Sequence, residues 1–254
     1  MEKKYRKKRN RSLGQHFLVD GNAVKKIIAL SKIDGNDVVY EVGSGNGILT
    51  EELCKISKFV HSFEIDPYLY YNCKSRLPYG NLNLHNLDGF DNIIGVRFDV
   101  FFSSLPYSES RHAFSWLCQR GFKKGILLLQ REFVEKLLSP PGDKNYRAIS
   151  IISQYRFYVR VLLDVPPSSF TPRPRVDSVL IEISPKCPPL SKKTIDDIQF
   201  LLSFKKKNIS FLLKYFKKPK ENNGVFDFSK ILDKKLGQLH VEQIYQLSLF
   251  LNKG

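Results

Sequence analysis

Short apolar runs alternate with amphipathic patterns along the first 185 residues of the chain. Runs rich in β-branched and aromatic residues predict buried strands, and apolar residues that recur every three or four positions predict helices. Strands are expected over residues 38–42, 59–63, 82–87, 97–102, 126–130, 157–165 and 176–183. Helices are expected over residues 22–31, 48–56, 67–75, 108–119 and 131–139. This alternation predicts an α/β fold with a mostly parallel sheet and helices on both faces, and the last two strands are expected to pair antiparallel at one edge.

The segment Pro185-Lys186-Cys187-Pro188-Pro189 interrupts this pattern. Prolines lack a backbone N–H and have a fixed φ, so a regular element does not continue through them. We therefore expect two domains, residues 1–185 and residues 186–254, of which the second is a small, basic, helical domain. Its helices are predicted over residues 194–204, 209–216 and 241–251.

Positive charge is concentrated at the two ends of the chain, whose formal net charge is +16. Residues 1–11 hold seven Lys or Arg and one Glu, residues 186–254 hold fourteen Lys and six acids, and residues 12–185 hold twenty bases and eighteen acids. A nearly balanced body between two basic ends favours a polyanionic partner that is contacted from both sides. The N-terminal arm, Met1–Arg11, is equally well explained as a solvated tail in the absence of such a partner.

The composition also limits the class of protein. No run of about 18 apolar residues occurs, so no membrane span is predicted, and the N-terminus lacks the apolar stretch of a signal peptide. The cysteines, Cys54, Cys73, Cys118 and Cys187, form no C-x-x-C pair, which indicates reduced thiols in the cytoplasm. The five histidines show no ligand spacing, so no metal is expected. The absence of heptads and of a large apolar stripe predicts a monomer.

A glycine-rich loop follows the first predicted strand. Val38–Val42 runs into Gly43-Ser44-Gly45-Asn46-Gly47, and a helical pattern begins at Ile48. Glycines allow a tight turn and let a ligand lie against bare backbone. The spacing is G-x-G-x-G and not the G-x-G-x-x-G of dinucleotide binders, so a ligand with a sugar and an amino-acid tail fits better than a pyrophosphate.

Two acidic residues follow the next two predicted strands. Glu64 comes after Phe59–Phe63 and Asp88 comes after Leu82–Leu87, so both are expected at the same edge of a parallel sheet as the glycine loop. Glu64 can accept hydrogen bonds from both hydroxyls of a ribose, and Asp88 can accept one from an adenine amino group. Each residue alone is also explained as a surface charge or a helix cap. Together with the glycine loop they predict S-adenosylmethionine as the cofactor.

The residues Ser104-Leu105-Pro106-Tyr107 follow the apolar run that ends at Phe102. A hydroxyl and a free carbonyl at a turn can accept hydrogen bonds from an amino group while an aromatic ring stacks on the base that carries it. Alone, the segment is also typical of a proline turn at a strand end. Beside a cofactor site it predicts methyl transfer to the exocyclic amine of a base. Ser104, Leu105 and Tyr107 are then the candidate catalytic residues.

Over about residues 9–185, the chain resembles ribosomal RNA adenine dimethyltransferases of the small-subunit (KsgA-type) branch. The motifs that carry the resemblance are Gly14-Gln15-His16-Phe17-Leu18, Glu41-Val42-Gly43-Ser44-Gly45-Asn46-Gly47, Glu64-Ile65-Asp66, Leu105-Pro106-Tyr107, Gln130-Arg131-Glu132 and Phe170-Thr171-Pro172-Arg173-Pro174-Arg175-Val176-Asp177-Ser178. The resemblance implies a Rossmann-like, S-adenosylmethionine-dependent methyltransferase sheet. It further implies dimethylation of the N6 amines of two adjacent adenines near the 3′ end of small-subunit ribosomal RNA, within a pre-ribosomal particle.

The resemblance also implies which residues form the site. Cofactor contacts are expected from Gln15, His16, Leu18, Gly43, Ser44, Gly45, Glu64, Ile65, Asp88 and Ser104. Contacts to the target base and its RNA are expected from Pro106, Tyr107, Phe170, Arg173 and Arg175. Phe170 is equally well explained as an anchor of its own loop. The two arginines are expected to contact phosphates as single charges.

Two positions depart from the family pattern. His16 stands where the family has the Asn of Gln-Asn-Phe-Leu, and Ser104 stands where it has the Asn of Asn-Leu-Pro-Tyr. A serine hydroxyl also accepts a hydrogen bond, but it reaches less far than the Asn amide. Two alternatives therefore stay open. One is a ribosome-assembly or RNA-binding factor of the same fold with weakened catalysis, and the other is a large-subunit ribosomal RNA adenine N6-methyltransferase.

Deleting Met1–Arg11 should weaken RNA binding and flatten its dependence on salt, because up to seven cationic side chains would no longer displace counterions. The slope of log affinity against log salt concentration, measured for the full chain and the shortened chain, tests this. Cofactor affinity serves as the control and should stay the same. Equal slopes would show that the arm makes no contact with RNA.

Overall fold

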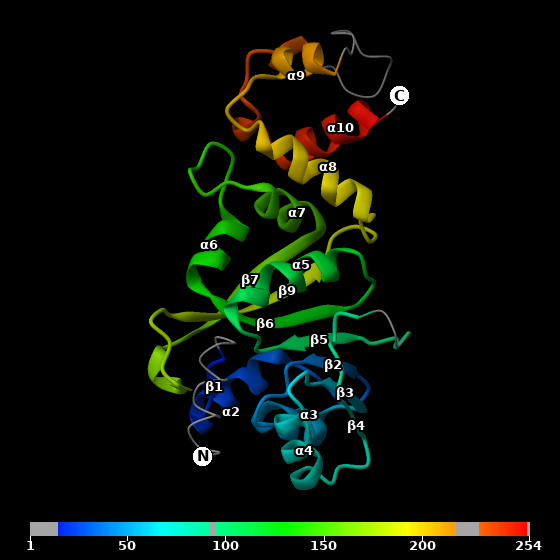
Figure 1. Ribbon diagram of the computed structural model, residues 1–254, viewed down its shortest axis with the longest axis vertical. Helices are drawn as coiled ribbons and strands as arrows, with labels where there is room; N and C mark the ends of the chain where they lie inside the picture. The colour runs from blue at the N-terminus through cyan, green and yellow to red at the C-terminus, as the bar shows by residue number, and fades with distance from the viewer. Residues whose placement is uncertain (1–14, 92–94, 217–228, 253–254) are drawn as a thin grey trace. The chain divides into compact units, whose positions relative to one another are not determined.

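The computed structural model describes residues 15–91, 95–216 and 229–252, which form a seven-stranded sheet with flanking helices (Figure 1). The strand order is β4-β3-β2-β5-β6-β9-β7. The strands are β2 (Val38–Val42), β3 (Phe59–Phe63), β4 (Leu82–His85), β5 (Val100–Ser103), β6 (Lys124–Gln130), β7 (Phe157–Val165) and β9 (Ser178–Pro185). The first five in this order run parallel, and β9 runs antiparallel to β6. The predicted α/β fold with a mostly parallel sheet is confirmed.

The strand register brings four strand ends together. Val42, the last residue of β2, pairs with Phe63 on β3 and with Ser103 on β5. Phe63 in turn pairs with His85, the last residue of β4. Because these strands are parallel and end in register, the segments that follow them lie along one edge of the sheet.

Helices connect the strands of the first part of the chain. They are α2 (Gly21–Ser31), α3 (Ile48–Ile56), α4 (Pro67–Arg76), α5 (Ser110–Cys118) and α6 (Arg131–Leu138). The Asp20 carboxylate accepts from the first free N–H groups of α2, and the Asp66 carboxylate does the same for α4, so both helices begin at a side-chain cap. The apolar side chains Ile27, Leu53 and Val60 are fully buried in the core that α2 and α3 share with the sheet.

A two-stranded sheet joins two segments that lie far apart in the sequence. β1 (Phe17–Leu18) pairs antiparallel with β8 (Phe170–Thr171), and Leu18 lies opposite Phe170. Both side chains are buried in the core. The sequence did not predict this pairing, because a strand of two residues shows no hydrophobic period.

Besides β1 and β8 and shifts of one or two residues at several element ends, three further differences from the predicted elements stand out. β4 ends at His85 and not at residue 87, and β5 begins at Val100 and not at residue 97. The third difference is a helix that was not predicted, α7 (Ala148–Arg156). It buries Ser150 and Ser153 as well as its apolar residues, so its sequence lacks the one-sided apolar pattern of a surface helix.

The chain divides into two compact units. The first holds the described residues of Met1–Trp116, Gly121–Phe133 and Val159–Pro185, and the second those of Leu117–Arg120, Val134–Tyr158 and Lys186–Gly254. The second unit contains α7, α8 (Lys192–Ser203), α9 (Ile209–Tyr215) and α10 (Val241–Asn252). One junction lies at Pro185, where the sequence predicts a boundary. The inclusion of two earlier segments in the second unit had no signal in the sequence.

A buried arginine holds distant segments of the second unit together. The Arg156 side chain is 1% exposed, and its guanidinium donates to the carbonyl of Cys187 at 2.5 Å and to that of Arg120 at 2.8 Å. A buried cation without hydrogen-bond acceptors would cost several kcal/mol, so the two carbonyls replace its hydration. The contact brings the chain before β6 and the chain after β9 onto the end of α7.

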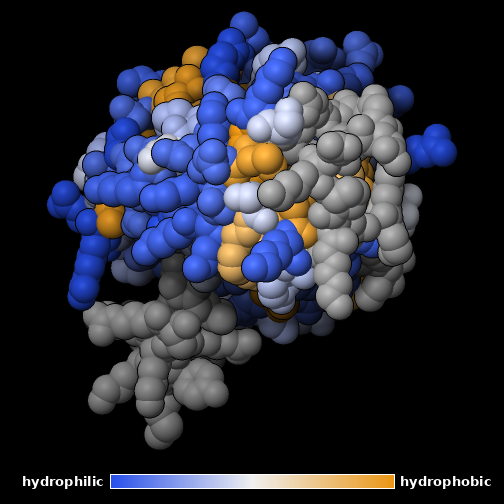
Figure 2. Space-filling view, turned by 90° about the horizontal axis from the view of Figure 1, so that it is seen from above, coloured by the Kyte–Doolittle hydropathy of each residue, from blue (hydrophilic) through white to orange (hydrophobic). Residues whose placement is uncertain are grey.

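The surface of the second unit combines aromatic and cationic side chains. Phe200, Phe211 and Tyr215 are exposed on α8 and α9, and the Lys207 ammonium lies 5.0 Å from the centre of the Phe211 ring. The face of the molecule seen in Figure 2 is mainly hydrophilic, with a few apolar side chains gathered between the polar ones. Such a mixture suits contact with RNA, which presents both phosphates and unstacked bases.

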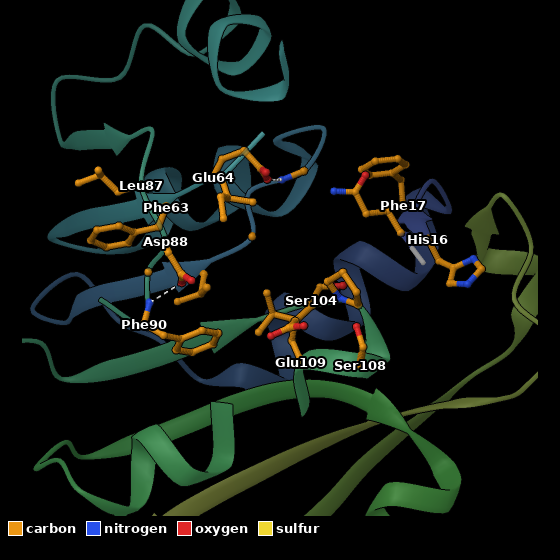
Figure 3. A pocket seen from close by; sticks show the side chains of 18 residues that line it. His16, Phe17, Phe63, Glu64, Leu87, Asp88, Phe90, Ser104, Ser108 and Glu109 are labelled. Atoms are coloured by element: carbon orange, nitrogen blue, oxygen red, sulfur yellow. Dashed lines mark hydrogen bonds between the residues drawn. The ribbon is translucent and has the colours of Figure 1, made fainter. Parts of the chain in front are cut away.

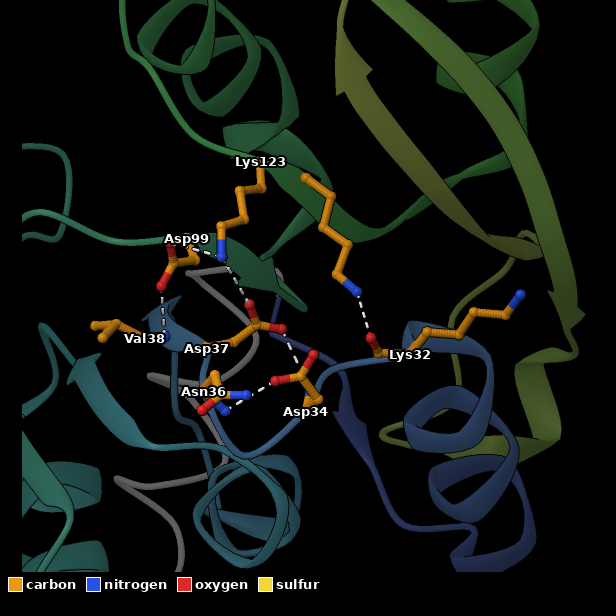
Figure 4. A network of polar contacts seen from close by, with 8 residues as sticks. Lys32, Asp34, Asn36, Asp37, Val38, Asp99 and Lys123 are labelled. Atoms are coloured by element: carbon orange, nitrogen blue, oxygen red, sulfur yellow. Dashed lines mark hydrogen bonds and ion pairs between the residues drawn. The ribbon is translucent and has the colours of Figure 1, made fainter.

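A polar network links the beginnings of three strands at the opposite, amino-terminal edge of the sheet (Figure 4). The Asp99 carboxylate accepts from the Val38 N–H at 2.9 Å, and the Lys123 ammonium lies 3.1 Å from Asp99 and 3.5 Å from Asp37. Lys124 donates to the carbonyl of Lys32, the residue that directly follows α2. The Lys123 side chain is mostly exposed, so solvent screens both ion pairs and they add little to the stability of the fold. The network therefore serves mainly to align β2, β5 and β6.

A buried carboxyl group lies in the middle of the sheet, below the glycine loop. One oxygen of Glu41 on β2 accepts from the Thr50 hydroxyl on α3 at 2.7 Å and from the Ser62 hydroxyl on β3 at 2.6 Å. Glu41 is 2% exposed. Burial raises the pKa of Glu41 to about 7, although the two hydroxyl hydrogen bonds lower it. The group therefore joins three elements and titrates near neutral pH.

Raising the pH from 5 to 8 should lower the free energy of unfolding through Glu41. The folded state binds its proton up to pH of about 7 and the unfolded chain only up to the ordinary value of 4.5, so the stabilisation is full below 4.5 and is lost as the pH rises through 7. The difference corresponds to about 3 kcal/mol. Urea unfolding at both pH values should show this loss in the wild type and not in Glu41→Gln. An equal loss in both proteins would contradict the assignment.

Candidate functional site

The glycine loop between β2 and α3 forms the first wall of a cavity. Gly43, Gly45 and Gly47 have φ angles of +85°, +56° and +77°, a region that side-chain-bearing residues rarely adopt. A Cβ atom at Gly43 would lie 3.0 Å from the Leu105 side chain, and one at Gly45 would lie 3.2 Å from Phe17. Glycine is therefore required here both by the backbone conformation and by the close approach of neighbouring segments.

The carboxyl ends of four parallel strands surround this cavity, whose volume is about 500 Å³ (Figure 3). Glu64 follows β3, Asp88 lies in the loop after β4, and Ser104 follows β5. The lining residues are Gln15, His16, Phe17, Val42, Gly43, Gly45, Phe63, Glu64, Ile65, Leu87, Asp88, Gly89, Phe90, Ser104, Leu105, Pro106, Ser108 and Glu109. This size and the mixture of apolar walls with a few polar groups are typical of a small-molecule site.

Glu64 fixes the position of the glycine loop through a backbone hydrogen bond. One of its carboxylate oxygens accepts from the Gly45 N–H and the other from the Asp66 N–H, both at 2.9 Å. Burial raises the pKa of Glu64, although these backbone hydrogen bonds lower it. Each oxygen keeps a second lone pair, so the carboxylate can still accept hydrogen bonds from two hydroxyls of a ligand.

The loop after β4 is fixed from below by two aromatic side chains that the sequence analysis missed. The Tyr40 hydroxyl donates to the Gly89 carbonyl at 2.7 Å, and the Trp116 indole N–H donates to the Phe90 carbonyl at 2.9 Å. Asp88 accepts from the Phe90 N–H at 2.9 Å. The sequence pattern indicates only that both aromatic residues belong to the core. The tertiary structure shows that the Tyr40 hydroxyl and the Trp116 indole N–H reach the loop that lines the cavity.

The turn after β5 also lines a second, smaller cavity. Ser104, Leu105, Pro106 and His16 line both cavities, and the second is completed by Tyr107, Leu128 and Phe170. The Tyr107 hydroxyl lies 2.6 Å from the Ser178 hydroxyl, and burial raises the pKa of Tyr107, so the phenol is neutral. The Tyr107 ring centre is 5.8 Å from that of His16.

Most of the residues predicted for the site line one of these cavities. Leu18 and Ser44 do not: Leu18 is buried in the core, because neighbouring residues of a strand face opposite sides and Phe17 faces the cavity. The Ser44 side chain is buried, and its carbonyl accepts from the Gly47 N–H to close the turn. Arg173 and Arg175 are exposed and line neither cavity. The predicted N-terminal arm, Met1–Arg11, lies outside the described residues.

Several lining residues were not predicted. Phe63, Leu87 and Phe90 supply apolar walls, and their only sequence signal is that they adjoin or nearly adjoin Glu64 and Asp88. Glu109 adds a third carboxylate, 3.6 Å from the His112 ring nitrogen. Glu109 lies only a few residues after Ser104. A prediction that followed the chain a little further beyond the end of the strand would therefore have included Glu109.

In residues 15–91, 95–216 and 229–252, no group of three or more His, Cys, Asp or Glu side chains could hold a metal ion. None of the described helices is long and apolar enough to cross a membrane.

Comparison with known proteins gives consistent matches over almost the whole chain. The model of a family described as ribosomal RNA adenine dimethylase matches residues 6–253. The chain is 35% identical to ribosomal RNA small subunit methyltransferase A of Thermotoga neapolitana, over 96% of this chain and 92% of that protein. It is 32% identical to a probable ribosomal RNA small subunit methyltransferase A of Methanococcus aeolicus, over 92% of this chain and 93% of the relative.

Two solved structures have a similar fold. A dimethyladenosine transferase from Plasmodium falciparum superimposes with a TM-score of 0.78 and 27% identity, covering 94% of this chain and 98% of its own. The 23S rRNA methyltransferase ErmE superimposes with a TM-score of 0.66 over 93% of this chain and all of its own. At 21% identity the second match shows the fold alone. The Rossmann-like sheet with a helical C-terminal part is thereby confirmed.

Replacing Glu64 with Ala should weaken binding of S-adenosylmethionine, because a ribose would lose a charged acceptor that contributes about 1 to 3 kcal/mol. Isothermal titration calorimetry measures the change. Glu52→Ala, which removes a half-buried carboxylate of α3 that pairs with Lys55, is the matched control and should bind as the wild type does. Unchanged affinity in a folded Glu64→Ala protein would remove Glu64 from the cofactor site.

Proposed function

The chain belongs to the ribosomal RNA adenine dimethylase family, and from this premise we propose that it transfers methyl groups from S-adenosylmethionine to the N6 amines of two adjacent adenines. The target adenines lie near the 3′ end of small-subunit ribosomal RNA. The enzyme acts in the cytoplasm, as a monomer, on a pre-ribosomal particle. The matched relatives are named as small-subunit methyltransferases, which favours the small subunit over the large one.

The observation that carries the proposal is the shared wall between the two cavities. The residues Ser104, Leu105 and Pro106 of the turn after β5 line both the larger cavity and the smaller one. A cofactor in the larger cavity and a base at the smaller one would therefore meet at this turn. That is the geometry that a direct transfer between two ligands requires.

The larger cavity suits S-adenosylmethionine in its shape and in its polar groups. The glycine loop presents bare backbone, Glu64 can accept from a ribose, and Asp88 can accept from an adenine amine. The Gln15 side-chain oxygen is buried at the cavity wall without a hydrogen-bond partner among the described residues, so it can accept from an ammonium group. When bound, this cofactor supplies an electrophilic methyl group on a sulfonium.

The turn provides the acceptors that an adenine amine needs. The lone pair of N6 is delocalised into the ring, and hydrogen bonds from both N–H groups to well-placed acceptors favour a tetrahedral nitrogen whose lone pair is available. We assign the acceptors to the Ser104 hydroxyl and the Leu105 carbonyl, and the stacking surface to the Tyr107 ring. The Tyr107–Ser178 hydrogen bond holds that ring in place. The methylated amine is acidic enough to lose its proton to water.

The RNA must present the target adenines outside a helical stack, because a stacked and paired base cannot bring its N6 amine to the acceptors of the turn. A loop or another open segment satisfies this condition. Arg173 and Arg175 are exposed in the segment that leads to Ser178, the hydrogen-bond partner of Tyr107. We expect both arginines to contact phosphates of the RNA.

Labelled S-adenosylmethionine, incubated separately with immature small subunits, large subunits and free RNAs, tests the proposal directly. Label should appear on adjacent adenines near the 3′ end of the small-subunit RNA. Label on large-subunit RNA alone would support the large-subunit alternative. Binding to small subunits without any label would support an assembly factor that has lost catalysis.

In the same assay, Ser104→Ala should slow the single-turnover rate of methyl transfer by about ten- to a thousand-fold, in line with the loss of one transition-state hydrogen bond. Cofactor affinity should change far less. Ser75→Ala, at an exposed position of α4, is the control and should match the wild type. If Ser104→Ala transfers methyl groups at the wild-type rate, the hydroxyl takes no part and the Leu105 carbonyl is the main acceptor.

A further inference from the structure

The loop between β8 and β9 is held at both ends by residues that line the smaller cavity, beside which we place the target base. At its first end, the His16 ring nitrogen Nδ1 lies 2.6 Å from the Pro172 carbonyl oxygen. A carbonyl only accepts, so Nδ1 carries the hydrogen and donates. At its other end, the Ser178 hydroxyl is hydrogen-bonded to the Tyr107 hydroxyl at 2.6 Å. We call residues 172–178 the arginine loop, because Arg173 and Arg175 lie between these two anchors.

The two anchoring side chains also contact each other. The rings of His16 and Tyr107 are tilted by 31° with centres 5.8 Å apart. The chain thus forms a closed circuit that runs from His16 through the arginine loop to Ser178, then to Tyr107 and back to His16. A further hydrogen bond, from the Arg131 N–H to the Asp177 carbonyl at 3.0 Å, fixes the second end of the loop to the beginning of α6.

The backbone explains why residue 16 reaches the loop. β1 pairs antiparallel with β8, Phe17 lies opposite Thr171, and the next positions outward are therefore 16 and 172. An imidazole at position 16 spans the gap to the Pro172 carbonyl. Position 16 is also one of the two places where the chain departs from the family pattern, and the other, Ser104, lines the same two cavities.

The cations of the arginine loop are available for a ligand. Arg173 and Arg175 are exposed, and neither has an ion-pair partner within the described part of the chain. Arg131, by contrast, pairs with Asp164 at 2.8 Å. A phosphate that approaches the loop would therefore meet two free guanidinium groups without having to displace a carboxylate.

We propose that His16 is a positioning residue that couples the arginine loop to the Tyr107 ring, so that phosphate binding at Arg173 and Arg175 orders the surface on which the target base stacks. The inference rests on the proposed function and goes beyond it, because it assigns the arginines an effect on the rate of transfer in addition to RNA affinity. His16 acts through Pro172 and Tyr107 and takes no direct part in the chemistry.

A double-mutant cycle tests the coupling. The loop variant Arg173→Ala/Arg175→Ala is combined with His16→Phe, which keeps a ring but removes the donor, and with His16→Gln, which keeps an N–H donor. In the wild-type background, the loop variant should raise KM for the RNA and lower the single-turnover rate at saturating RNA by about three- to tenfold. In the His16→Phe background it should raise KM only. His16→Gln should restore the effect on the rate.

The matched control is Lys25→Ala/Lys26→Ala, which removes the same number of exposed cations from α2 and should leave the saturating rate unchanged in every background. If the loop variant lowers the saturating rate by the same factor in the wild-type and His16→Phe backgrounds, the effects are additive and the coupling is refuted. If His16→Phe does not fold, Ser178→Ala takes its place, because it removes the other anchor of the arginine loop. The effect of the loop variant on the saturating rate is then compared between the wild-type and Ser178→Ala backgrounds. A wild-type protein that transfers no methyl group refutes the proposed function itself, which is a separate result.

Discussion

The close approach of two backbone turns at the end of neighbouring parallel strands is the constraint on which the site depends. β2 and β5 end in register, with Val42 opposite Ser103, so the glycine loop and the turn that begins at Ser104 leave the sheet side by side. The Leu105 side chain fills the space where a Cβ of Gly43 would stand. The glycine loop lines the larger cavity, and the turn after β5 lines both cavities. Their distance is set by strand pairing and not by flexible side chains.

The surrounding structure keeps these turns in position through buried polar contacts. Glu41 joins β2, β3 and α3 below the glycine loop, and Glu64 joins the loop to the end of β3. Tyr40 and Trp116 hold the carbonyls of the loop after β4 from within an aromatic cluster. Each of these groups is satisfied by specific partners in a region of low dielectric, where an unpaired polar atom would be costly. The core is therefore specific at the places where it supports a ligand.

Segments from the beginning and from the end of the first unit lie around the smaller cavity. The β1–β8 pairing places His16 beside the arginine loop, and β9 places Ser178 beside Tyr107. The contact between His16 and Pro172 joins residues 156 positions apart in the sequence, and that between Tyr107 and Ser178 joins residues 71 positions apart. The second unit adds exposed lysine and aromatic side chains, which extend the basic character of the chain.

The sequence by itself determined the alternation of strands and helices, the glycine loop, the acidic residues after β3 and β4, and the turn at Ser104. These features are local, because a period of two or 3.6 residues and a glycine spacing can be read within a short window. The tertiary structure alone decided that Leu18 turns into the core, that Tyr40 and Trp116 reach the loop after β4, and that α7 joins the second unit. Those outcomes depend on which face of an element meets which neighbour, and such contacts between distant segments leave no local pattern in the sequence.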